Sequence, residues 1–95
     1  MTQEQMNQCC RLGFNWWQDT EGLNDYDFII VVNSEGNFSV ANLVEVKYIA
    51  QHDILFWAHP HKLSNYSLGY ARNKMNYIDQ RYLREYLERQ KIESK

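Results

Sequence analysis

The sequence predicts an α+β fold with an N-terminal helix, a three-stranded antiparallel meander and a long C-terminal helix packed on one face of the sheet. Apolar residues recur every three or four positions near both ends of the chain, which is the period of an amphipathic helix. The middle of the chain instead holds β-branched runs separated by turn-forming residues. A chain of 95 residues without linker or repeat fits one domain, so we expect residues 1–95 to form a single small domain.

The first element is predicted to be a helix from Thr2 to about Gln18. Thr2 and Gln5 have the spacing of a capping box, in which each residue satisfies a backbone N–H of the other. Gly13 lies inside this stretch, where glycine weakens a helix by about 1 kcal/mol relative to alanine or marks close packing. The helical spacing is carried by Met6, Cys9 or Cys10, Gly13, Trp16 and Trp17.

Three strands are predicted in the middle of the chain. The continuous apolar run Phe28–Val32 is typical of a strand covered on both faces. A second strand is expected within Phe38–Ile49, because apolar and charged residues alternate over positions 44–48. Ile54–Ala58 is the third. The connections are short, which favours an antiparallel meander because parallel strands need a long crossover.

The C-terminal part is predicted to be one long helix. Pro60 ends the sheet, and Ser64 or Asn65 caps a helix that runs to about Ile92. Its core-facing stripe is expected to consist of residues spaced by three and four: Leu68, Ala71, Met75, Ile78, Tyr82 and Tyr86.

Composition excludes several classes of protein. The aromatic content of 15% argues against a disordered chain. The net charge of −2 excludes both a uniformly basic nucleic-acid binder and a polyanionic mimic of DNA. No apolar run approaches the roughly 18 residues of a membrane span, and the polar N-terminus lacks signal-peptide features, so we expect a cytoplasmic protein with no membrane contact. The adjacent Cys9 and Cys10 fit a reducing compartment, with one thiol in the core and one near the surface.

The residues suited to catalysis form no recognisable signature. His59 and His61 share one side of an extended segment, but His52 lies about 20 Å away if each intervening strand residue spans about 3.3 Å. That distance argues against a three-histidine zinc site completed by His52 or by Asp53 beside it. The four glycines are isolated and form no phosphate-binding loop. We therefore expect a non-enzymatic protein without catalytic residue, metal or cofactor, with a small enzyme or metal domain around His59 and His61 as a minor alternative.

Charge and tyrosines gather in the C-terminal third. Residues 64–95 hold seven basic and four acidic side chains, whereas residues 1–63 hold three basic and eight acidic ones. Tyrosines alternate with the basic residues there, and Tyr, Trp and Arg dominate binding hot spots. A solvated helix face is the alternative interpretation. The expected protein interface comprises Tyr66, Tyr70, Arg72, Lys74, Tyr77, Arg81 and Arg84, together with Trp16 and Trp17.

These features predict a non-enzymatic protein-binding module that occupies or blocks the surface of an acidic or mixed-charge partner. Small phage or mobile-element proteins that inhibit a host defence or regulatory complex have this character. The alternative is a nucleic-acid-binding module that uses the basic, tyrosine-rich C-terminal helix. We also expect a homodimer, because a small core is often completed by a second copy. Its expected contact is the stripe Leu83, Tyr86 and Leu87.

Overall fold

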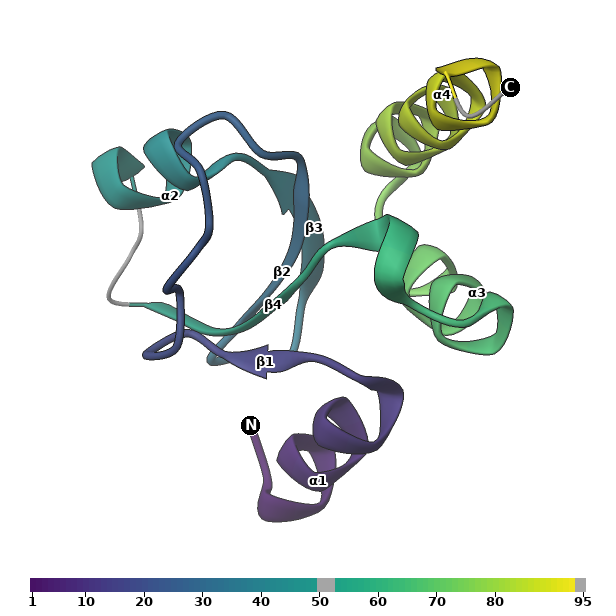
Figure 1. The fold of residues 1–95 in the computed structure, drawn as a ribbon. Coiled ribbons are helices and arrows are strands. Elements are labelled where there is room, and N and C mark those ends of the chain that lie inside the picture. The colour runs from purple at the N-terminus through teal and green to yellow at the C-terminus, as the bar shows by residue number, and fades with distance from the viewer. Residues whose placement is uncertain (50–52, 94–95) are drawn as a thin grey trace.

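The computed structural model describes residues 1–49 and 53–93 and confirms the α+β class. Four α-helices and four strands alternate irregularly along this part of the chain (Figure 1). In chain order the elements are α1 (Gln3–Leu12), β1 (Asn15–Trp16), β2 (Ile29–Asn33), β3 (Phe38–Ala41), α2 (Leu43–Ile49), β4 (Ile54–Ala58), the 3-10 turn η2 (Pro60–Lys62), α3 (Asn65–Asn73) and α4 (Tyr77–Glu93).

The sheet has four strands in the order β1-β4-β2-β3, so the predicted three-stranded meander is wrong in detail. All three pairings are antiparallel, as predicted. β2, however, lies between β3 and β4, whereas a meander would place β3 between β2 and β4. β3 and β4 therefore run parallel to each other without being neighbours. The chain makes this crossover with a short helix, although the short connections predicted strands that follow one another as a meander.

That helix is α2, in a stretch for which a strand was expected. Asn42 begins it, because the Asn42 side-chain oxygen accepts a hydrogen bond from the Glu45 N–H at 2.8 Å. Leu43 and Val46 are buried and lie three positions apart, whereas Val44 is exposed. The burial thus follows a helical period, although the residue types alternate as in a strand.

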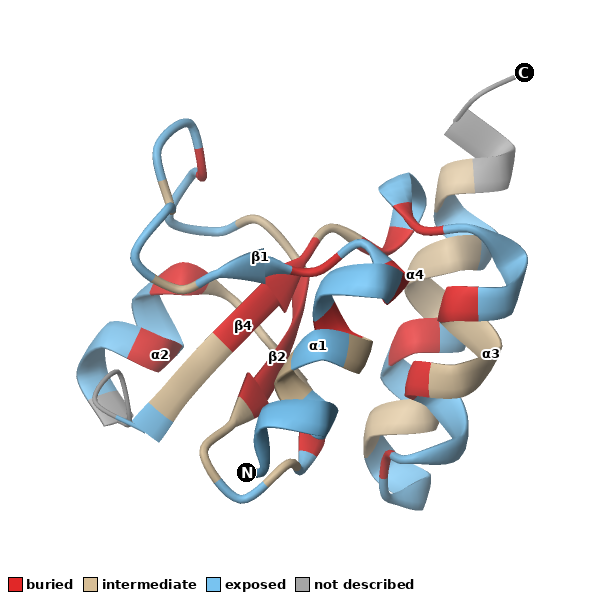
Figure 2. Cartoon of the chain, turned by 90° about the horizontal axis from the view of Figure 1, so that it is seen from below, coloured by how far each residue is buried: buried red, intermediate tan, exposed pale blue. Residues whose placement is uncertain are grey.

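Helices cover both faces of the sheet, because α2 lies on the face opposite to α1, α3 and α4 (Figure 1). The buried residues concentrate in β2 and β4 and on the inward sides of the helices (Figure 2). Ile30 and Val32 share a core with α1, α3 and α4, whereas Ile29 and Val31 share a second core with α2. The run at the start of β2 is therefore buried on both faces, as predicted.

The N-terminal helix is shorter than expected. Its capping box is present, since the Thr2 oxygen accepts the Gln5 N–H at 3.1 Å and the Gln5 side chain accepts the Thr2 N–H at 2.8 Å. It ends at Leu12 because Gly13 adopts the left-handed conformation, with φ of 100°, and donates its N–H back to Cys10. The following residues extend into β1, an edge strand that the sequence did not reveal.

The predicted long C-terminal helix is two helices, α3 and α4. Ser64 caps α3, as expected, by accepting the Ser67 N–H at 3.2 Å. A second cap, Asn76, accepts the Asp79 N–H at 2.8 Å and starts α4 in a new direction. The break changes which residues face inward, so the core positions of α4 are Leu83 and Leu87. Among the described helices none is long and apolar enough to span a membrane.

Candidate functional site

The outward side of α4 carries three large apolar side chains. Tyr77, Ile78 and Tyr82 are 77%, 62% and 53% exposed, respectively. They line one shallow hollow of about 230 Å³ together with Arg81 and Glu85. We call Tyr77, Ile78, Arg81 and Tyr82 the α4 face. Ile78 and Tyr82 were expected in the core stripe, and that part of the prediction is wrong because Asn76 starts a new helix with a different rotation.

Three arginines gather beside the α4 face. Arg72 from α3 and Arg81 and Arg84 from α4 line a hollow of about 310 Å³ with Tyr77 and Gln80, which we call the arginine hollow. Arg81 Nε lies 3.3 Å from the Glu85 carboxylate in an exposed pair. Neither Arg72 nor Arg84 has a carboxylate within ion-pair distance among the described residues. The hollow therefore presents uncompensated positive charge to solvent.

Only some of the predicted interface residues lie close together in the structure. Arg72, Tyr77, Arg81 and Arg84 line the arginine hollow, but Tyr66, Tyr70 and Lys74 are not among its lining residues. Tyr70 is half-buried against the ring of Phe38, and Lys74 Nζ lies 5.4 Å from the centre of the Tyr70 ring. Tyr70 therefore contributes to the core more than to a surface.

The tryptophans lie at the opposite edge of the sheet. Trp16 is half exposed and packs on Phe56 with ring centres 4.4 Å apart. The Trp17 side chain is half-buried against the second core, and the Trp17 backbone N–H donates to the Leu55 carbonyl at 2.8 Å. The two rings lie on opposite faces because consecutive residues of an extended chain point in opposite directions. They are separate from the α4 face.

The residues expected at a dimer contact are used within one chain. Leu83 is 1% exposed, so its side chain offers no surface to a second copy. Leu87 packs against the same core. The Tyr86 ring stacks on Phe28 with centres 4.5 Å apart and planes 11° apart. Tyr86 and Leu87 are half-buried and keep part of their surface in solvent, so the homodimer and a contact through these two residues remain predictions.

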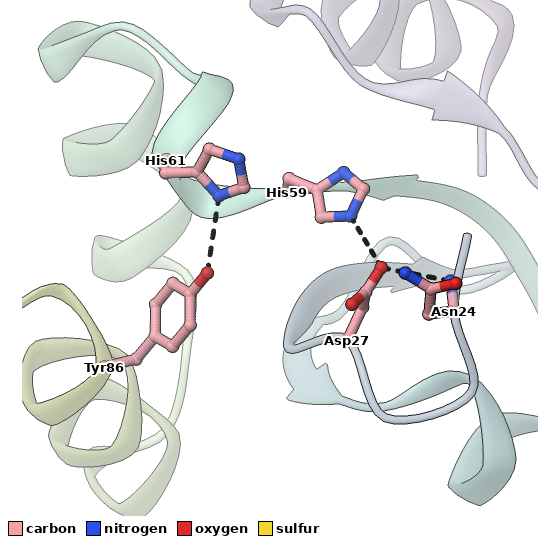
Figure 3. A network of polar contacts seen from close by, with 5 residues as sticks. All are labelled: Asn24, Asp27, His59, His61 and Tyr86. Atoms are coloured by element: carbon pink, nitrogen blue, oxygen red, sulfur yellow. Dashed lines mark hydrogen bonds and ion pairs between the residues drawn. The ribbon is translucent and has the colours of Figure 1, made fainter. Parts of the chain in front are cut away.

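His59 and His61, on either side of Pro60, each make a polar contact with another segment (Figure 3). His59 Nε2 lies 3.3 Å from an Asp27 carboxylate oxygen, which also accepts the Asn24 backbone N–H at 3.0 Å. The Tyr86 hydroxyl lies 3.3 Å from His61 Nδ1. The Asp27–His59 contact thus links the segment before β2 with the residue that follows β4, and the His61–Tyr86 contact links η2 with α4.

Electrostatics favour the charged form of Asp27 and the neutral form of His61. The pKa of Asp27 is lowered, chiefly by the hydrogen bond from the Asn24 backbone and further by His59. The pKa of His61 is also lowered, first by burial and then by electrostatic interaction with the neighbouring His59 and Lys62.

The hollow next to His59 is about 300 Å³, and among the described residues no serine, threonine or cysteine lines it. Cys9, the buried thiol, has a pKa raised to about 11 by burial, which disfavours the nucleophilic thiolate. No group of three His, Cys, Asp or Glu side chains within residues 1–49 and 53–93 is arranged to hold a metal ion. His52 lies outside the described residues.

The geometry defines a small α+β protein whose most distinctive surface is apolar and basic. Comparison with protein-family models, with curated proteins and with solved structures finds no match to this chain. Its function must therefore be inferred from the site itself.

Proposed function

We propose that this chain is a protein-binding module that docks on its partner through the α4 face. The observation that carries the proposal is the grouping of Tyr77, Ile78 and Tyr82 on the solvent side of one helix. Single exposed apolar residues are ordinary, but adjacent ones mark interaction surfaces. Aromatic and arginine side chains are also the residues that contribute most to binding at interface centres.

The neighbouring charges support a partner with an acidic or mixed surface. Arg72 and Arg84 have no carboxylate partner among the described residues, so a carboxylate of a bound protein could pair with them without displacing an existing ion pair. Positive charge around an apolar centre accelerates association with an acidic protein and fixes the orientation of the complex. A module of this kind acts by covering a surface of its partner, as an inhibitor does.

A pull-down from native lysate with matched variants tests this proposal. The tagged wild-type protein, the double variant Ile78→Ser/Tyr82→Ala and the control Tyr48→Ala are compared after nuclease treatment. Tyr48 is the matched control because it is a 90%-exposed tyrosine on α2, across the sheet from α4. We expect one protein to bind wild type and the control but to be lost from the double variant, while circular dichroism shows that all three are folded. Equal capture by all three would contradict the proposal.

A nucleic-acid-binding module is the second candidate, and the arginine hollow is the observation that favours it. Arginines next to a tyrosine suit phosphate contacts and stacking on unpaired bases. Binding of this kind weakens steeply with salt, because each phosphate contact releases counterions. Loss of the captured material on nuclease treatment, with a steep salt dependence that Arg81→Ala/Arg84→Ala reduces, would favour this candidate over the first.

A further inference from the structure

A groove larger than the two hollows on α4 lies where α3, α4 and η2 meet. Its volume is about 630 Å³, and we call it the α3–α4 groove. Its floor is apolar, formed by Pro60, Leu63, Leu68, Leu83 and Leu87. Arg72 lines this groove and also the arginine hollow, so the two hollows are adjacent and share that side chain.

The charged residue that lines the described part of the groove is basic. Among the described lining residues there is no aspartate or glutamate, and Arg72 is the one lysine or arginine. His61 is the other ionisable group there, and its lowered pKa favours the neutral imidazole at pH 7. An occupant that combines apolar groups with a carboxylate therefore complements this groove.

Gly69 forms part of the wall and has no structural reason to be glycine. It lies in the interior of α3 and is not among the positive-φ glycines of the chain. A Cβ built on Gly69 would meet no atom within 4 Å, so packing does not require its absence. Glycine in a helix interior costs about 1 kcal/mol relative to alanine. What Gly69 provides instead is open space in the groove, where another backbone can approach closely.

We propose that the α3–α4 groove binds a segment of the partner protein that carries apolar side chains and an acidic residue, with its backbone passing over Gly69. The inference rests on the proposed protein-binding function and specifies the chemistry of the docking segment. The apolar side chains of the segment lie on Leu68 and Leu87, and its carboxylate pairs with Arg72. Because Arg72 also lines the arginine hollow, the segment continues onto the α4 face.

A displayed library of random peptides is the probe that tests the groove. Peptides are selected on the immobilised wild-type protein, and their affinities are measured for Gly69→Leu, Arg72→Glu and Asn73→Leu. Gly69→Leu fills open space, and Arg72→Glu reverses the charge at an exposed position with no ion pair among the described residues. Asn73→Leu is the matched control, because Asn73 is an exposed residue of α3 that does not line the groove.

We expect selected peptides to combine apolar residues with Asp or Glu. Their affinity should fall about tenfold or more, which is about 1.4 kcal/mol, on Gly69→Leu and on Arg72→Glu, and stay unchanged on Asn73→Leu. If Gly69→Leu does not fold, the test depends on the affinity of the selected peptides for the charge-reversal variant Arg72→Glu. Failure to enrich any peptide, or peptides that bind both groove variants as tightly as wild type, would overturn the inference.

The two proposals fail in different ways. In one outcome, the selected peptides bind Gly69→Leu and Arg72→Glu as tightly as wild type and fail to bind Ile78→Ser/Tyr82→Ala. That result would support docking through the α4 face and refute docking in the α3–α4 groove. Peptides that depend on Gly69 and Arg72, combined with a lysate in which wild type captures no protein, would retain the groove and contradict the proposed function.

Discussion

Replacing Gly69 with alanine is expected to stabilise the protein. Gly69 is an interior residue of α3 and does not have a positive φ, and a methyl group there meets nothing within 4 Å. The substitution therefore removes backbone freedom from the unfolded chain without creating a clash in the folded one. From helix propensity the gain is about 0.5–1 kcal/mol in the free energy of unfolding.

The same substitution at Gly13 is expected to have the opposite sign. Gly13 ends α1 with φ of 100°, a conformation that costs an alanine about 1–2 kcal/mol. Its Cβ would lie 3.5 Å from a methyl of Leu63, which is ordinary contact, so the penalty comes from the backbone alone. The two variants thus compare a glycine whose backbone conformation alanine can also adopt, Gly69, with one whose positive φ favours glycine, Gly13.

Urea unfolding followed by far-UV circular dichroism measures both changes. For a chain of this size 1 kcal/mol corresponds to a shift of about 4–8 °C in Tm, which thermal unfolding detects independently. We expect Gly69→Ala to unfold at higher urea and higher temperature than wild type, and Gly13→Ala at lower. A destabilised Gly69→Ala would mean that the wall of the groove is packed in solution, which would remove the structural basis of the docking inference.

Three further predictions follow from burial and charge. Leu83→Ala should lower the free energy of unfolding by about 2–5 kcal/mol because it leaves a cavity in the core. Tyr82→Ala, at the exposed preceding residue, should change it by less than about 0.5 kcal/mol. Similar losses for the two variants in denaturant unfolding would contradict the orientation of α4. A thiol reagent should modify Cys10 rapidly and Cys9 only on unfolding, because burial raises the pKa of Cys9 to about 11; two equally fast thiols would refute this. The lowered pKa of His61 means that the folded state binds fewer protons than the unfolded chain, so this residue's contribution to stability falls as pH drops through the ordinary histidine range near 6.5. His61→Gln should flatten that part of the pH–stability curve, and an unchanged slope would count against the shift.

Much of the fold could be predicted from local signals in the sequence. The capping box of Thr2 and Gln5 starts α1, and Ser64 starts α3, because a cap is made by side chains three residues from the N–H groups that they satisfy. The apolar run in β2 indicated a strand buried on both faces. The candidate site was predicted in part, since Arg72, Tyr77, Arg81 and Arg84 were expected together and line one hollow.

The tertiary structure decided the remaining features, because they depend on which surfaces meet. Positions 44–48 alternate as a strand does, yet the chain forms α2 there. This helix covers Ile29 and Val31 and lets β4 return beside β2. The sequence predicted one helix across Asn76, whereas the structure starts a new helix there, with Leu83 facing inward and Ile78 facing outward. The sequence by itself therefore determined where most elements begin and the chemistry they carry. The direction of each helix and strand, and hence which residues reach solvent together, was determined by contacts between segments far apart in the chain.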